Sequence, residues 1–154
     1  MKRAMTIILL LAIFAASAAF ADENEYFILC NPDSHVCIRR SPRKDSDEIG
    51  QLEFGEMILT DGRKRNGFLH CIRLSNEWGE GWVYKGYLVS DQPRKWGQLV
   101  SVTANGRVAS RRYVNGKRKG WLKKGQRVTV YGYSDEWAVT SRGFVKTKYL
   151  EIGN

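Results

Sequence analysis

Short apolar and β-branched runs, bounded by glycine or asparagine, follow one another along most of the chain. Examples are the alternating stretch at 36–40 and the runs at 57–59 and 127–131. Turn-forming residues such as Gly62, Asn66, Gly106 and Asn115 separate these runs. After residue 21, no stretch repeats its apolar residues with the 3.6-residue period of an amphipathic helix. The pattern therefore predicts an all-β protein.

The pattern of the first half returns in the second half. GQLEFGE at 50–56 matches GWLKKGQ at 120–126, and VCIRR at 36–40 matches VASRR at 108–112. Residues 28–30 match residues 100–102 with the same offset of 72, which aligns Cys30 with Val102. Gly-Trp-Val at 81–83 with Tyr-Leu at 87–88 matches Gly-Phe-Val at 143–145 with Tyr-Leu at 149–150. We interpret the chain as a duplicated small domain, with copies at about 26–90 and 98–152.

The order of these motifs resembles the bacterial SH3 domain, in tandem. Each copy has a strand ending in Arg, a Gly-x-Leu-x-x-Gly phrase, an aromatic residue after a turn, and Gly-aromatic-Val-x-x-x-Tyr-Leu. The first copy departs from the family in its longer stretch at 74–80, and the second in reading Ala-Ser before Arg111. The resemblance implies two SH3-like β-barrels, at 22–91 and 98–154, joined by a linker at 92–97. It also implies a binding module for cell-wall peptides or related ligands.

The first 21 residues have the features of a secretory signal peptide. Lys2 and Arg3 precede an apolar run at 6–16, and Ala19-Phe20-Ala21 offers small residues for a signal peptidase. An uncleaved membrane anchor is the alternative, but the run is shorter than the ~20 residues that span a bilayer. We therefore expect cleavage after Ala21 and a secreted or periplasmic protein.

Positive charge is concentrated in the second half. Residues 22–103 contain 11 Lys and Arg against 13 Asp and Glu, whereas residues 104–154 contain 12 against 3. A basic cluster around Trp121 is a predicted anion-binding site. It consists of Arg111, Arg112, Lys117, Arg118, Lys119, Lys123, Lys124 and Arg127. The alternative is a solvated face that only keeps the protein soluble. Teichoic acid, lipopolysaccharide, anionic lipid head groups and, less favoured, nucleic acid would supply suitable anions.

Aromatic residues beside glycine, charged or turn residues are candidates for an exposed ligand groove. They are Trp78, Tyr84, Trp121, Tyr133 and Trp137. By contrast, Trp82, Tyr87, Phe144 and Tyr149 recur at fixed spacing in both copies, which is typical of core packing.

The three cysteines all lie in the first copy. Strand alternation and the alignment with the second copy turn Cys30 and Cys71 inward and Cys37 outward. We predict a Cys30–Cys71 disulfide and an exposed Cys37 thiol, with a Cys30–Cys37 bridge as the alternative. A zinc site with His35 and His70 is less favoured because the spacings fit no zinc signature. No cofactor or metal is predicted.

No catalytic constellation is evident, so we predict that the protein is not an enzyme. His70 and Cys71 are neighbours and would lie on opposite faces of a strand, whereas His35 and Cys37 would share one. The two leading hypotheses are recognition of wall peptide through aromatic grooves and electrostatic binding of an anionic polymer. An adaptor for another secreted protein is a third.

Overall fold

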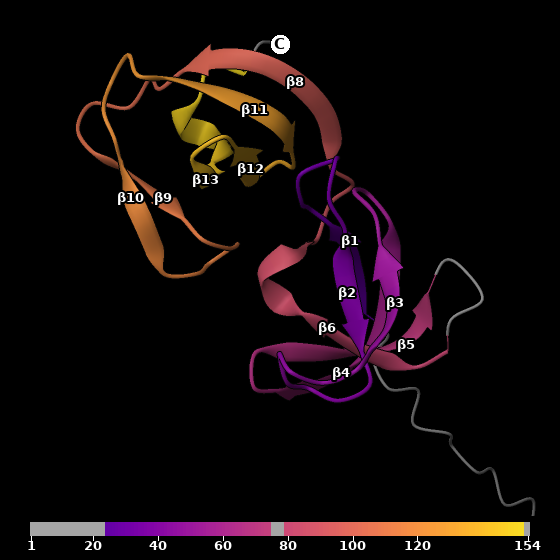
Figure 1. The fold of residues 1–154 in the computed structure, drawn as a ribbon. Coiled ribbons are helices and arrows are strands. Elements are labelled where there is room, and N and C mark those ends of the chain that lie inside the picture. Colours follow the sequence, from indigo (N-terminus) through magenta and orange to yellow (C-terminus); the bar gives the residue numbers. More distant parts are fainter. Residues whose placement is uncertain (1–23, 75–78, 153–154) are drawn as a thin grey trace, which may run out of the picture.

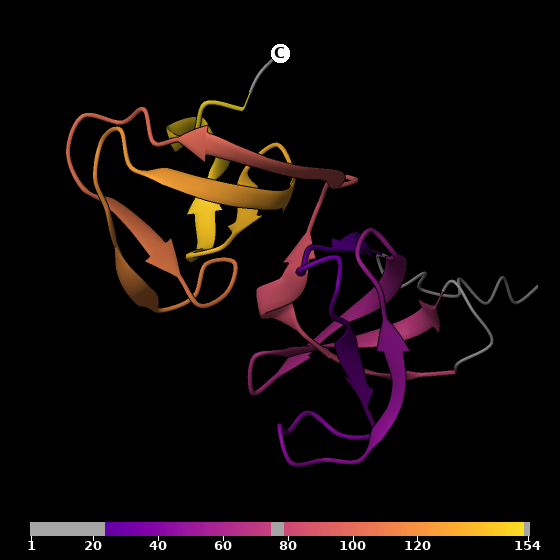
Figure 2. The same cartoon turned by 45° about the horizontal axis from the view of Figure 1, so that its top comes forward.

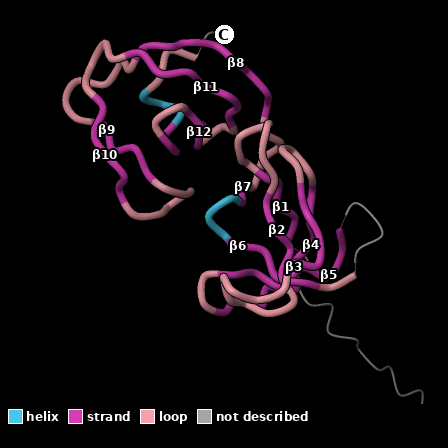
Figure 3. Tube along the Cα trace, in the orientation of Figure 1, coloured by secondary structure: helices cyan, strands magenta, loops and turns pink. Residues whose placement is uncertain are grey.

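The computed structural model describes residues 24–74 and 79–152. Within this part, strands and two short 3₁₀ turns, η1 (Lys85–Tyr87) and η2 (Thr147–Tyr149), make up the regular structure. The two turns are the cyan segments of Figure 3. The predicted all-β class is confirmed. The predicted signal peptide and Trp78 lie outside the described residues.

The first half forms one antiparallel sheet with the strand order β3-β2-β6-β5-β4-β1-β7. Its strands are β1 (Asn24–Ile28), β2 (Val36–Arg39), β3 (Glu48–Leu52), β4 (Met57–Arg65), β5 (Phe68–Leu74), β6 (Gly81–Tyr84) and β7 (Leu88–Val89). The alternation seen in the sequence is kept in β2, where Val36 and Ile38 are buried while Cys37 and Arg39 are only half-buried. One face of this strand therefore packs into the core.

The second half forms a six-stranded sheet with the order β10-β9-β13-β12-β11-β8. Its strands are β8 (Arg94–Ser101), β9 (Val108–Arg111), β10 (Arg118–Leu122), β11 (Arg127–Tyr133), β12 (Trp137–Thr140) and β13 (Gly143–Lys146). The first sheet has the same order apart from its extra strand β7. In Figures 1 and 2, β8 arches over this sheet beside β11.

Both strand orders are open in the described part of the chain, with β3 and β7 at the ends of the first sheet and β10 and β8 at the ends of the second. No pairing recorded within residues 24–74 and 79–152 closes either sheet. The closed barrels therefore stay a prediction. No helix in this part of the chain has the length and apolar character needed to cross a bilayer.

The two sheets match in strand order, but their register differs from the sequence alignment at one point. The Gly55 amide donates to the Ile28 carbonyl at 2.8 Å, and the Gly125 amide donates to the Val102 carbonyl at 2.8 Å. Ile28 is therefore the counterpart of Val102, so the alignment of Cys30 with Val102 was wrong by two residues. A shift of two keeps the same face of a strand, which is why the inward assignment of Cys30 survives.

The connection between the sheets is shorter than the predicted linker at 92–97. β7 ends at Val89 and β8 begins at Arg94, so only residues 90–93 lie between them. Arg94 and Lys95, which the prediction placed in the linker, pair with β11 instead, opposite Tyr133 and Gly132.

Each sheet has its own apolar core. Leu52 and Leu122, the leucines of the repeated phrase, are 0% and 2% exposed and lie in the first and second cores. Gly55 and Gly125, which follow them, have φ of +81° and +76°, a conformation that favours glycine. The repeated phrase therefore encodes a buried leucine followed by a tight turn.

A third apolar cluster joins the two sheets. The first half contributes Leu29 and Val89, and the second contributes Val114, Trp137, Val139 and Phe144. The Val114 amide also donates to the Gly86 carbonyl at 2.9 Å, where the loop after β9 meets the turn after β6 (Figure 1). The Asp135 amide donates to Asp91 Oδ2 at 2.7 Å. We call this region the interdomain cluster; it places residues of both halves around one pocket.

Candidate binding site between the two sheets

Four aromatic rings surround a pocket of about 210 Å³ beside the interdomain cluster. Phe68, Tyr84 and Tyr87 come from the first half, and Tyr113 comes from the second. The remaining lining residues are His35, Val36, Cys37, Arg39 and Lys44. The pocket thus combines aromatic walls with cationic and polar groups at its edge, a composition typical of ligand sites.

The rings are held by edge-to-face contacts. Tyr113 lies with its centroid 5.0 Å from that of Tyr84 and 5.3 Å from that of Tyr87, and Phe68 lies 5.3 Å from Tyr84. Gly86 permits this approach, because a Cβ there would stand 2.6 Å from the Tyr113 Cβ. The phenols are therefore presented by a packed interface that needs both halves of the chain.

Electrostatics favour a ligand with negative charge. Burial, with Tyr113 as a further cause, raises the pKa of Tyr87 to about 12, so its phenol stays neutral at physiological pH. The Lys44 ammonium lies 5.8 Å from the Tyr84 ring centroid. The Arg39 guanidinium donates to the Ser46 carbonyl at 2.7 Å, which fixes its position at the pocket.

His35, Cys37 and Glu48 form a cluster at the rim of this pocket. Their ligand-type atoms all lie within 4.8 Å of one another. Burial raises the pKa of the Cys37 thiol, and its hydrogen bond to Glu48 raises it further. The same hydrogen bond lowers the pKa of the Glu48 carboxyl, and a second one from Gln51, at 2.8 Å, acts in the same direction. His35 and Cys37 share a face, as predicted.

The predicted groove aromatics do not form one site. Tyr84 lines the pocket, Trp121 is 46% exposed under the Arg118 guanidinium at 4.5 Å, and Tyr133 packs against Trp96 at 5.4 Å. The prediction for Trp137 was wrong: it is 1% exposed, in the interdomain cluster. Its position after a turn indicated exposure, but it lies in a cluster with Leu29 and Val89 of the other sheet.

Most of the predicted anion-binding residues lie on the β9–β10 hairpin and the turn that follows it. Arg112, Lys117, Arg118, Lys119, Lys123, Lys124 and Arg127 are all exposed. Arg111 is the exception, because it is half-buried and donates to the Gly116 carbonyl at 2.8 Å. Arg39 makes the corresponding contact in the first sheet, so Arg111 has a structural role.

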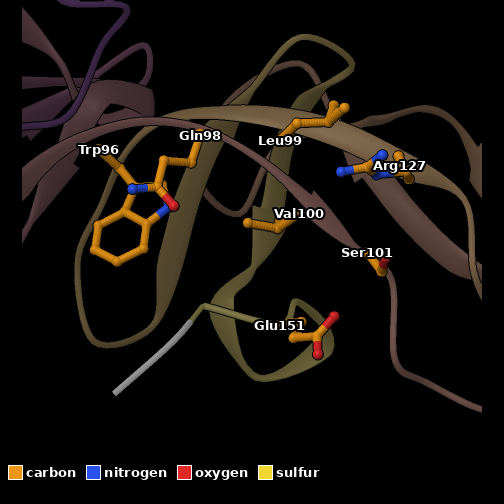
Figure 4. A pocket seen from close by; sticks show the side chains of 7 residues that line it. All are labelled: Trp96, Gln98, Leu99, Val100, Ser101, Arg127 and Glu151. Carbon is orange, nitrogen blue, oxygen red and sulfur yellow. The ribbon is translucent and has the colours of Figure 1, made fainter.

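Arg127 lies apart from the hairpin, in a shallow depression of about 660 Å³ along β8 (Figure 4). Trp96, Gln98, Leu99, Val100, Ser101 and Glu151 line the rest of it. Leu99 is 49% exposed there, and Glu151 adds an opposing charge. Because it also contains an apolar and an acidic side chain, this depression is less basic than the surface of the hairpin.

The three cysteines are free thiols in the structure, so the predicted Cys30–Cys71 disulfide is not formed. The assignment of faces behind it is confirmed: Cys30 and Cys71 are 2% and 0% exposed in the first core, and Cys37 is half-buried. Sharing a core does not bring two sulfur atoms together. The Cys30 thiol donates to the Ser34 carbonyl, and the Cys71 thiol to the Leu69 carbonyl.

His70 and Cys71 lie on opposite faces of β5, as predicted. His70 packs its ring against Trp82 at 4.9 Å and is 3.0 Å from Asp61 Oδ2, whereas Cys71 lies in the core. Burial raises the pKa of the Cys71 thiol to about 12. This neighbouring pair therefore offers no nucleophile and base.

Tyr113 was not predicted as a site residue, and Tyr87 was expected in the core packing. Both line the pocket, although Tyr87 also packs on Phe144, with ring centroids 6.2 Å apart. The pocket unites the two halves of the chain, and a comparison of one copy with the other carries no signal for such a site.

No protein-family model and no curated protein matches the chain. Among solved structures, the chain is similar to NlpC1 from Trichomonas vaginalis, with 16% identity and a TM-score of 0.37 over 94% of this chain and 51% of that one. It is also similar to NlpC2 from the same organism, with 13% identity and a TM-score of 0.36 over 88% and 50%. The chain spans about half the length of these structures. At such scores, neither likeness carries an argument about this protein.

Proposed function

We propose that the protein is an exported, non-enzymatic binding module that holds a cell-wall peptide, or another short envelope segment, between two SH3-like units. The observation that carries the proposal is the aromatic pocket built jointly by Tyr84, Tyr87 and Tyr113. Rigid phenol rings supply contact area and hydrogen-bonding groups at little conformational cost. The nearby Lys44 ammonium suits a carboxylate of a wall peptide.

The test is binding of the reduced mature chain to purified peptidoglycan and to its soluble stem peptides. Tyr113→Ala and Tyr84→Ala should each weaken the affinity about tenfold or more, as expected for aromatic anchors in a pocket. Trp121→Ala is the matched control, because it removes an exposed ring that does not line the pocket. Equal binding by all three variants and the wild type would reject the pocket as the site.

A second function is supported by the basic hairpin. Residues 104–134 contain nine Lys and Arg and no Asp or Glu. An anionic envelope polymer such as teichoic acid or lipopolysaccharide would bind such a surface by releasing counterions, so its affinity would fall steeply with salt. Nucleic acid would meet the same chemistry but is not favoured for an exported protein.

The combined variant Trp121→Ala, Lys123→Ala and Lys124→Ala tests this second function. It should weaken binding to teichoic acid or heparin and flatten the dependence of affinity on salt. Peptide binding at the pocket should be unaffected by the same changes. An unchanged salt slope would mean that these residues are only a solvated face.

Export itself rests on the predicted signal peptide. Expression of the full chain in a bacterial host, followed by N-terminal sequencing of the exported protein, should give Asp22 as the first residue. Retention of Met1 in the purified protein would contradict the proposed secreted or periplasmic location.

A further inference from the structure

Two adjacent strands bring three different metal-ligand types to one place. His35 precedes β2, Cys37 lies two residues later on its outward face, and Glu48 begins β3. In a regular ladder, Ile49 would share the face of Gln51 and Cys37. The β2–β3 register instead shifts between Ile38 and Arg39.

This shift reverses the faces to which Glu48 and Ile49 of β3 point. Ile49 packs against the first core, and Glu48 turns to the outer face, where its carboxylate accepts a hydrogen bond from Gln51 at 2.8 Å. A bulge that re-aims a side chain is a recurrent device beside functional sites. The sequence spacing of His35, Cys37 and Glu48 does not show that they converge, because the bulge is not visible in the pattern.

We propose that His35, Cys37 and Glu48 bind a divalent transition-metal ion, with Zn²⁺ the best match, at the rim of the interdomain pocket. An imidazole, a thiolate and a carboxylate form a mixed N, S, O set that suits zinc rather than calcium or magnesium. The thiolate and the carboxylate together neutralise the dication, and the Cys37 proton leaves to solvent when the Zn–S bond forms.

The geometry needs only a small adjustment. Zinc bonds of about 2.0–2.3 Å place tetrahedral ligand atoms roughly 3.5 Å apart, compared with the 4.8 Å within which the three atoms already lie. His35 and Glu48 are exposed and have room to rotate, while the half-buried Cys37 is fixed on its strand. The nearby Arg39 opposes a cation by charge, but its guanidinium is drawn to the Ser46 carbonyl.

Three protein ligands leave one coordination position for water, as in zinc sites that remain open. His35 and Cys37 also line the pocket, so the ion would lie at its edge. The site goes beyond the proposed function, since metal binding does not require that a peptide occupies the pocket.

The experiment uses the reduced, tag-free mature chain and Co²⁺ as a spectroscopic probe, followed by competition with Zn²⁺. We expect one Co²⁺ per chain, with a thiolate-to-cobalt charge-transfer band that Zn²⁺ removes. Cys37→Ser should abolish the band, and His35→Ala and Glu48→Gln should each weaken Zn²⁺ binding at least 10–100-fold, the loss seen when even an outer partner of a ligand is removed.

Glu53→Gln is the matched control, because it removes an exposed carboxylate just after β3 that does not belong to the cluster. It should bind the metal like the wild type. If Cys37→Ser does not fold, the two exposed variants still decide the outcome. The proposal is overturned by the absence of a charge-transfer band in the wild type, by a band that survives Cys37→Ser, or by equal affinities for wild type, His35→Ala and Glu48→Gln.

Discussion

Replacement of Trp137 tests whether the two sheets share a core in solution. Trp137 is 1% exposed in the interdomain cluster. Truncation of a buried Trp to Ala costs about 3–5 kcal/mol, and the contact with Lys146, whose ammonium lies 4.2 Å from the ring centroid, adds about 0.5–1 kcal/mol. The buried indole N–H has no hydrogen-bond partner in the described part of the chain. Its removal therefore offsets about 1–3 kcal/mol of this destabilisation.

The net expectation is that Trp137→Ala lowers the free energy of unfolding by about 3 kcal/mol. Trp137→Phe should cost only about 1 kcal/mol, because it keeps one ring and removes the unpaired N–H. The structure supports this choice, since Phe68 pairs with Tyr84 in β5–β6 as Trp137 pairs with Lys146 in β12–β13. Phe68 is thus the counterpart of Trp137 in the first sheet.

The assay is urea denaturation of the reduced mature chain, followed by circular dichroism. Trp121→Ala is the control; at 46% exposure it should stay within about 0.5 kcal/mol of the wild type. If Trp137→Ala also lowered the free energy of unfolding by less than about 1 kcal/mol, Trp137 would be exposed in solution. The two sheets would then not share the interdomain cluster.

Three further predictions concern the interface and the thiols. Gly86→Leu should drive Tyr113 out of the pocket, since even a Cβ would stand 2.6 Å from it, and calorimetry should then show two unfolding transitions in place of one. In the native protein, Ellman's reagent should modify Cys37 alone, because Cys30 and Cys71 are buried and burial raises the pKa of both thiols, that of Cys71 to about 12; rapid modification of more than one thiol would contradict this. The raised pKa of Tyr87, about 12 against an ordinary 10, gives stability that is complete below pH 10 and is lost as the pH rises to 12. Alkaline denaturation of Tyr87→Phe should lack this loss, and an equal loss in both proteins would refute the assignment.

The fold class was predictable because it depends on local pattern. Alternation at Val36 and Ile38 and the repeated Gly-x-Leu-x-x-Gly phrase report which side chains are buried, and the structure buries Leu52 and Leu122 accordingly. The linker was misplaced because Arg94, Lys95 and Gly97 are typical of an exposed loop, yet Arg94 and Lys95 pair with β11. Backbone pairing with a distant strand leaves little trace in local composition.

The candidate site was only partly predictable, because its parts come from both halves. Tyr84 was predicted, whereas Tyr113 carries no repeat signal and acquires its role from contact with Gly86 and Tyr87. The proximity of His35, Cys37 and Glu48 was not predicted for a related reason: only the bulge opposite Arg39 turns Glu48 toward Cys37.

The interdomain cluster also fixes the spacing between the aromatic pocket and the basic hairpin. Two modules on a flexible tether lose effective concentration as the tether lengthens. Here the connection is only residues 90–93, and side chains of both sheets are buried against each other. A chain-like ligand that reaches both surfaces would therefore be held by both with no further loss of freedom in the protein. If both proposed sites bind one ligand, ligands too short to reach both would gain nothing, so the fixed spacing would make affinity depend on ligand length.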